Sequence, residues 1–177
     1  MRELSLHMLD IMENSVRAGA TRLTIVIELD EQEQWLTLGV EDNGPGLPVS
    51  PEQALDPFFT TKTKKRTGLG LSLFQAAAQQ AGGNLSLQES ESGGIRVRAT
   101  FQYRHLDRAP LGDMAGSLMA LALSNPDTSF TCICRGPQGA SEAVSHQTDP
   151  RQPLSFTDAR AFGKRVQESI AAAGINA

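Results

Sequence analysis

The apolar residues of this chain recur with two periods, and each period predicts one kind of element. Over residues 3–17 they recur every three to four positions, which predicts a helix with one buried stripe. The members of this stripe are Leu4, Met8, Ile11, Met12 and Ser15. Over 21–30 and 35–42 apolar residues fall at every second position, which predicts two strands that each bury one face.

The same criteria divide the rest of the chain into further strands and helices. We expect strands at 84–90 and 95–103, and a hairpin of 129–136 with the residues after Gly139. We expect helices from the glycines at 68–70 to Gly82, from Pro110 to Asn125, and over 157–173. Neighbouring strands with helices between them predict an α/β fold, a two-layer α+β sandwich with a mixed sheet.

Length and charge narrow the class of protein. The 177 residues are enough for one domain over 1–104 and a small α+β extension over 105–177, where the character of the sequence changes. Sixteen basic and twenty acidic residues give a net charge of −4 without a basic face, so we expect no nucleic-acid partner. No apolar run is long enough to span a membrane, and acidic residues interrupt the N-terminal segment, so we expect a cytoplasmic protein. Cys132 and Cys134 are expected to be reduced thiols on a half-buried strand.

The first helix also carries a polar stripe. His7, Asp10, Asn14 and Arg17 are spaced three or four residues apart, so they lie along one face. When the stripe is considered alone, a solvated helix face is the favoured interpretation.

An aspartate at the end of the second strand predicts a binding site. The alternation places Asp42 on the same side as the apolar residues of its strand, where a carboxylate needs donors. Gly44 and Gly46 follow and let the backbone come close to another group. An inward carboxylate beside glycines suits the amino group of a flat ligand, although a simple Asp-Asn-Gly turn has the same sequence.

A basic segment leads into the next helix. Three lysines fall within Lys62–Lys65 and Arg66 follows, just before Gly68 and Gly70. A helix N-terminus with small residues and nearby cations is suited to bind phosphate. A solvated basic loop before a capped helix is the alternative.

These segments resemble, in order, the sequence boxes of the GHKL ATPases, also called histidine-kinase-like or Bergerat-fold ATPases. The boxes are LDIMENSVRAGAT for the N box, VEDNGPGL for the first glycine box, DPFFTTK for the phenylalanine box and GLGLSL for the second glycine box. The resemblance covers residues 4–104 and implies a Bergerat-type fold, with helices on one face of the sheet, that binds ATP and Mg²⁺.

The resemblance implies roles for individual residues. Asp42 would accept a hydrogen bond from the adenine amino group, Gly44 and Gly46 would line the adenine pocket, and Asn14 would hold Mg²⁺ on the phosphates. Lys62 would help to neutralise the transferred phosphate. The remaining nucleotide contacts, in a lid over 60–67 and in the second glycine box, would be Thr60, Thr61, Gly68, Leu69, Gly70 and Leu71.

Two positions depart from the family pattern. The DNA-remodelling branches have a glutamate as general base four residues before the N-box Asn, and here that residue is Asp10, which is shorter by one methylene. The family often has a threonine near the adenine where this chain has Ile95, which removes a polar contact to the base.

Three functions stay open at this level. The first is a kinase-like regulator that transfers phosphate to a partner protein; the others are a slow ATPase switch with Asp10 orienting water, and a nucleotide-sensing module without turnover. The printed chain begins within the N box, so we expect no phosphoacceptor hairpin on it and a partner protein instead. Either a monomer or a homodimer fits. The whole chain is also similar to small bacterial stand-alone ATP-binding proteins, which implies an accessory role at a hydrogenase or related redox complex.

Overall fold

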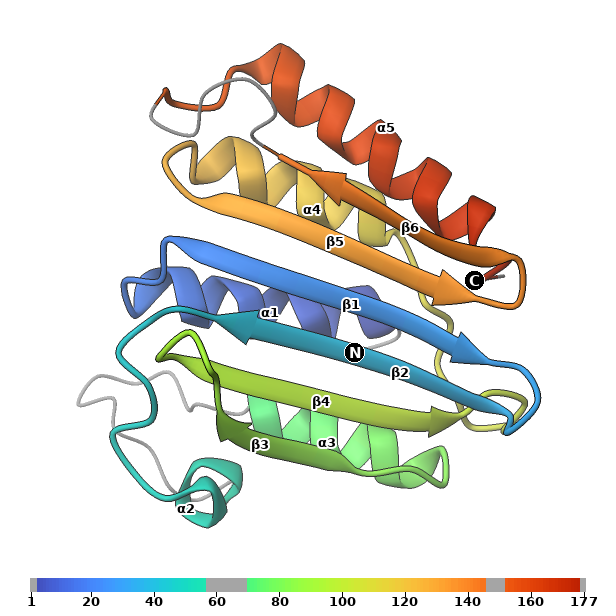
Figure 1. Cartoon of the computed structure of the whole chain (residues 1–177). Helices are drawn as coiled ribbons and strands as arrows, with labels where there is room; N and C mark the ends of the chain where they lie inside the picture. Colours follow the sequence, from blue (N-terminus) through green and yellow to red (C-terminus); the bar gives the residue numbers. More distant parts are fainter. Residues whose placement is uncertain (1–2, 57–69, 146–151, 176–177) are drawn as a thin grey trace.

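The chain folds around one six-stranded mixed sheet (Figure 1), seen in a computed structural model that describes residues 3–56, 70–145 and 152–175. The strand order is β3-β4-β2-β1-β5-β6. The strands are β1 Arg22–Asp30, β2 Trp35–Asp42, β3 Leu85–Glu89, β4 Ile95–Gln102, β5 Ser129–Gly136 and β6 Gly139–Val144. The helices are α1 Leu4–Arg17, α2 Pro51–Leu55, α3 Gly70–Gln80, α4 Met114–Ser124 and α5 Phe156–Ala172. This mixed sheet with helices on one side is the expected Bergerat-type fold.

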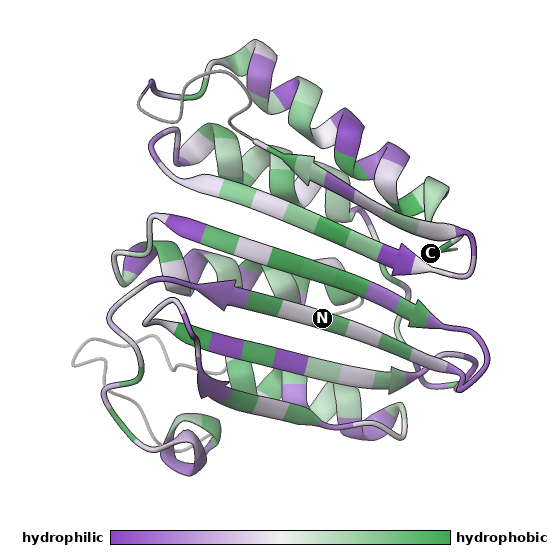
Figure 2. Cartoon of the chain, in the orientation of Figure 1, coloured by the Kyte–Doolittle hydropathy of each residue, from purple (hydrophilic) through white to green (hydrophobic). Residues whose placement is uncertain are grey.

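The predicted alternation sets which side of the sheet the helices cover. In β1 the residues Leu23, Ile25 and Ile27 are almost fully buried under α1, while the residues between them are only half-buried. Because side chains alternate along a strand, the register places Val40 of β2 and Cys132 of β5 beside Ile25 on the covered side. Figure 2 shows the resulting alternation of hydrophobic and hydrophilic residues along the strands. One face of the sheet is therefore core, and the other is open.

The C-terminal segment continues the same sheet. The predicted boundary near residue 104 follows β4, and beyond it β5 pairs in parallel with β1 while β6 pairs antiparallel with β5. The segment also satisfies the start of α1, because the amides of Leu4 and Ser5 donate to the carbonyls of Pro110 and Leu111 at 2.9 and 2.8 Å.

Helix α4 begins later than the sequence predicted. Gly112 has a φ of 76°, in the left-handed region, and it breaks the helix that was expected to open at Pro110. Asp113 then caps α4, because its side chain accepts a hydrogen bond from the amide of Gly116 at 2.8 Å. The predicted end at Asn125 is confirmed.

The short helix α2 was not predicted. Its sequence signal is a capping box, in which the side chains of Ser50 and Gln53 accept from each other's backbone amides. Pro51, at the first helical position, is a second signal. Among the described helices none is both long and apolar enough to cross a bilayer.

Candidate functional site

Asp42 lies at the end of β2 on the helix-covered side, and only 3% of it is exposed. Its carboxylate accepts three hydrogen bonds within the described part of the chain. Oδ2 accepts from Ser15 Oγ at 2.5 Å, and Oδ1 accepts from the amides of Gly44 at 2.9 Å and Ile95 at 3.2 Å. Since a carboxylate has about four acceptor positions, room is left for one more donor.

The glycines around Asp42 allow the chain to approach its carboxylate closely. A Cβ on Gly44 would lie 3.1 Å from Asp42 Oδ1, and a Cβ on Gly94 would lie 2.1 Å from the same oxygen. Gly46 has a φ of 80° and packs against the carbonyl of Gly93. Only glycine fits at 94 without displacing the carboxylate, and only glycine adopts the conformation at 46 without strain.

A second cluster lies where α1 meets the first turn of α3. A Cβ on Gly70 would fall 1.8 Å from Asp10 Oδ2 and 3.7 Å from Asn14 Nδ2, so both polar side chains reach the start of α3. Leu71, the next residue, is half-buried against the core. Because the first amides of a helix lack partners within it, this end of α3 is suited to an anion.

Helix α1 thus presents adjacent residues to two places. Ser15 reaches Asp42, whereas Asn14 reaches the start of α3. Arg17, the last member of the polar stripe, pairs with Glu13 at 3.4 Å on the exposed side of α1. The polar stripe predicted from the sequence therefore separates into a part that meets α3 and an exposed end.

His7, at the other end of the stripe, is buried. Its ring stacks on Phe74 of α3 with 5.5 Å between the ring centroids, and 3% of the residue is exposed. Nδ1 has no hydrogen-bond partner among the described residues. Burial is the main reason why the pKa of His7 is lowered, with a smaller contribution from the positive N-terminus.

Several contacts of the site were missed by sequence reasoning. Ser15 was assigned to the apolar stripe, and its signal was that it is the one polar member there. The amide of Ile95 and the close approach of Gly94 depend on how the β3–β4 hairpin folds onto β2, which has no local sequence signal. Asn43 was also missed: its Oδ1 accepts from the amides of Thr21 and Arg22 and ties the end of β2 to β1.

Some predicted site residues lie outside the described residues. These are Thr60, Thr61, Lys62, Gly68 and Leu69, together with the rest of the proposed lid over 60–67. Their roles stay predictions.

The described residues hold no group of three or more His, Cys, Asp or Glu side chains suited to a metal. The oxygens of Asp10 and Asn14, however, are the type of ligand that Mg²⁺ takes, and Mg²⁺ usually completes its shell with phosphates and waters. Cys132 and Cys134 are buried free thiols with sulfurs 3.9 Å apart, as expected.

Comparison with known proteins identifies the family of this arrangement. The family model of the histidine kinase-, DNA gyrase B-, and HSP90-like ATPases matches residues 2–105. The chain belongs to this family. All the site residues described above fall within the matched region.

Individual relatives cover different parts of the chain. The sensor histidine kinase CpxA of Escherichia coli K12 is 32% identical over 94 residues, which are 50% of this chain and 20% of CpxA. The sensor protein KdpD of the same strain is 31% identical over 97 residues, or 52% of this chain and 11% of KdpD. The crystal structure of the N-terminal domain of a DNA repair protein covers 98% of this chain and 58% of its own, with a TM-score of 0.53 and 16% identity. That likeness in fold includes the C-terminal segment.

Proposed function

We propose that this protein binds Mg-ATP between Asp42 and the start of α3 and transfers the γ-phosphoryl group to a partner protein. The observation that carries the proposal is that α1 contacts both ends of the proposed site. Ser15 donates to the carboxylate of Asp42 at the adenine end, while Asp10 and Asn14 reach the N-terminus of α3 at the phosphate end.

The Asp42 end fits adenine. Three donors fix its carboxylate and leave an acceptor position that an exocyclic amino group can use. Burial makes this hydrogen bond selective, because a ligand carbonyl at the same place would face a carboxylate without a proton between them.

The α3 end fits the phosphates. The N-terminus of α3 attracts negative charge, and the lack of a side chain at Gly70 lets Asp10 approach this turn closely. Asn14 and Asp10 supply oxygen ligands for Mg²⁺, which when bound neutralises phosphate charge and holds the phosphates in place. Phosphoryl transfer depends mainly on such positioning, so the protein does not need a nucleophile of its own that forms a covalent intermediate.

Transfer to a partner is favoured over hydrolysis by two observations. The relative CpxA is named a sensor histidine kinase and KdpD a sensor protein, although this chain spans 20% or less of the length of either. The residue four positions before the N-box Asn is Asp10, whose short side chain lies on the first turn of α3.

A slow ATPase switch is the second candidate. Asp10 lies at the phosphate end of the site, where a carboxylate is able to orient water. On this alternative, Asp10→Asn lowers phosphate release while nucleotide still binds, and Asp10→Glu raises it.

Incubation with γ-labelled ATP and Mg²⁺, with and without cell extract, tests the proposal. Label on a protein of the extract supports transfer in trans, and free phosphate without labelled protein supports the ATPase. Tight binding with neither product supports a nucleotide-sensing module. Asp42→Asn serves as the control that removes binding in all three cases.

A further inference from the structure

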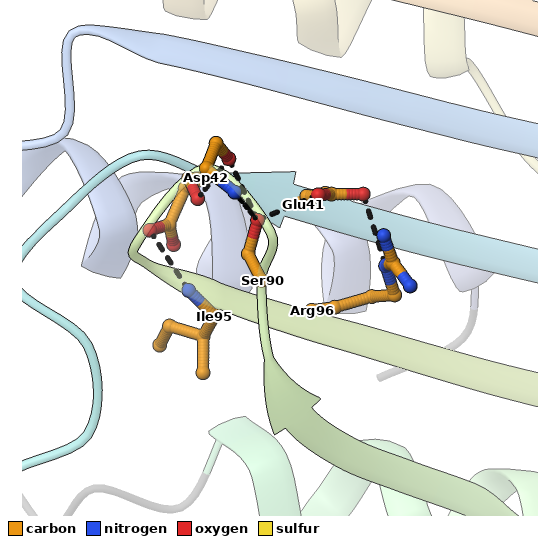
Figure 3. Close-up of polar contacts among 6 residues, drawn as sticks. Glu41, Asp42, Ser90, Ile95 and Arg96 are labelled. Atoms are coloured by element: carbon orange, nitrogen blue, oxygen red, sulfur yellow. Dashed lines mark hydrogen bonds and ion pairs between the residues drawn. The ribbon is translucent and has the colours of Figure 1, made fainter.

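A second carboxylate stands next to Asp42 in β2 and points to the opposite, open face of the sheet. Figure 3 shows Glu41 between Arg96 of β4 and Ser90, which follows β3. Glu41 Oε2 accepts from Arg96 Nε at 2.9 Å, and Oε1 accepts from Ser90 Oγ at 2.6 Å. The hydrogen bond from Arg96 is the largest reason why the pKa of Glu41 is lowered, so the side chain is ionised near neutral pH.

Two serines extend this contact to the backbone of Asp42. Ser92 Oγ lies 2.6 Å from Ser90 Oγ and 3.1 Å from the carbonyl oxygen of Asp42. An ionised carboxylate only accepts, so the Ser90 hydroxyl donates its hydrogen bond to Glu41. The single hydroxyl hydrogen of Ser92 points either to Ser90 Oγ or to the carbonyl of Asp42. The amide of Ser92 adds a second bond to Ser90 Oγ at 3.0 Å. The charge of Glu41 therefore makes the Ser90 hydroxyl a donor to Glu41 and an acceptor from the amide of Ser92.

The loop held by these serines carries one of the donors to Asp42. The amide of Ser90 donates to the carbonyl of Gly94 at 2.9 Å and closes the hairpin. Ile95 directly follows Gly94, and its amide donates to Asp42 Oδ1. At Gly94 the backbone is so close to Asp42 that even a Cβ has no room. A small shift of residues 90–94 must therefore move either the donor or the carboxylate.

We propose that Glu41 is a positioning residue for adenine recognition. Through Ser90 and Ser92 it holds the 90–94 hairpin that orients the carboxylate of Asp42, although its own side chain lies on the other face of the sheet. The inference rests on the proposed function, because it concerns the base that Asp42 recognises. Adenine offers an amino group where guanine has a carbonyl, so a carboxylate in a fixed orientation discriminates between the two bases more strongly than a loosened one.

Calorimetric titration of the full chain with ADP and with GDP, both with Mg²⁺, tests the inference. Ser90→Ala is expected to weaken ADP binding about tenfold and to narrow the ADP-to-GDP ratio by the same factor, because GDP does not use the oriented acceptor. Glu41→Gln is expected to act in the same direction. The double variant is expected to lose little more than either single variant, because both changes interrupt one chain of bonds.

Ser86→Ala is the matched control. Ser86 lies in β3 of the same hairpin, is exposed, and its hydroxyl makes only a 3.4 Å contact to the carbonyl of Arg98. Its removal should leave the ADP-to-GDP ratio at the wild-type value.

Hydrogen exchange of the Ile95 amide gives a second readout that needs no nucleotide. Exchange is expected to be faster in Ser90→Ala and Glu41→Gln than in wild type, and unchanged in Ser86→Ala. If both variants lose thermal stability but keep the wild-type ADP-to-GDP ratio and the wild-type exchange of Ile95, the network is merely structural and the inference is wrong. If wild type binds no ADP, or Asp42→Asn binds it equally well, the proposed function fails instead, and the exchange of Ile95 still decides whether Glu41 positions the hairpin.

Discussion

Two pairs of helices cover the same side of the sheet, and their contacts are of opposite kinds. Between α4 and α5 the contact is apolar: Gly163 brings the helices together, and a Cβ there would lie 2.9 Å from Cβ of Met119. Between α1 and α3 the corresponding space at Gly70 is filled by the carboxylate of Asp10. Close apolar packing stabilises a fold, whereas buried polar groups without full partners cost stability. The polar side chains of His7, Asp10 and Asn14 gather between α1 and α3, and we therefore place the proposed nucleotide site at that pair.

The largest expected effect is at Asp42. Asp42→Asn should weaken ATP binding by about 100-fold, because an amide loses the charge of the acceptor and can turn an NH₂ group toward the adenine amino group. Isothermal titration calorimetry measures the loss. Unfolding by urea serves as the control, since a folded variant is needed to assign the loss to the site. Unchanged affinity in a folded variant would remove Asp42 from the adenine site.

A matched pair of glycine substitutions tests the comparison itself. Gly70→Ala should weaken ATP binding about tenfold with little loss of stability, since the new Cβ displaces the movable end of the Asp10 side chain. Gly163→Ala should leave binding unchanged and cost about 1 kcal/mol of unfolding free energy, because crowding against Met119 outweighs the higher helix propensity of alanine. Calorimetry and urea unfolding of both variants give the four values. The comparison is wrong if the two substitutions affect binding and stability in the same proportion.

A smaller effect is expected at Asn14. Asn14→Ala should leave nucleotide binding without magnesium nearly intact and remove the roughly fivefold gain in affinity that Mg²⁺ provides. Glu13→Ala is the neighbouring control, because Glu13 pairs with Arg17 on the exposed side of α1. Titrations of the protein with ADP, in Mg²⁺ and in EDTA, separate the affinity for the nucleotide alone from the gain that Mg²⁺ provides. An equal magnesium gain in wild type and Asn14→Ala would show that Asn14 does not hold the ion.

The sequence predicted those parts of this molecule that depend on local pattern. The stripe of α1, the alternation of β1 and β2 and the inward carboxylate of Asp42 follow from periods of three to four and of two residues. The partners of Asp42 did not follow, since Ser15 and the amide of Ile95 reach it from elements distant in the chain. Helix α4 was placed too early because the conformation of Gly112 depends on its packing beside Glu3 and Ser5.

The domain organisation shows the same limit. A change of composition near residue 105 predicted an extension, but composition does not reveal that β5 pairs with β1 or that Pro110 and Leu111 accept from the first amides of α1. Pairings between distant segments are set by the whole packing arrangement, so sequence period alone cannot specify them.

The smallest expected effect concerns His7, whose buried ring belongs to the polar contact between α1 and α3. Burial lowers its pKa below the ordinary value of about 6.5, so just below that pH the unfolded chain binds a proton that the folded chain does not. Stability should therefore fall as the pH decreases from about 7 toward 5.

His7→Phe keeps the stack on Phe74 and removes both the titration and the Nδ1 atom that has no partner among the described residues. The variant should match wild type to within about 1 kcal/mol at pH 8 and become relatively more stable at pH 5. Urea unfolding at four pH values measures the difference, with His105→Gln as the control because His105 lies in the loop after β4, beside Asp107. If the unfolding free energies of wild type and His7→Phe change in parallel with pH, the His7 ring takes up a proton in the folded protein as readily as in the unfolded chain. The contact between α1 and α3 would then tolerate a buried positive charge, and the prediction would be wrong.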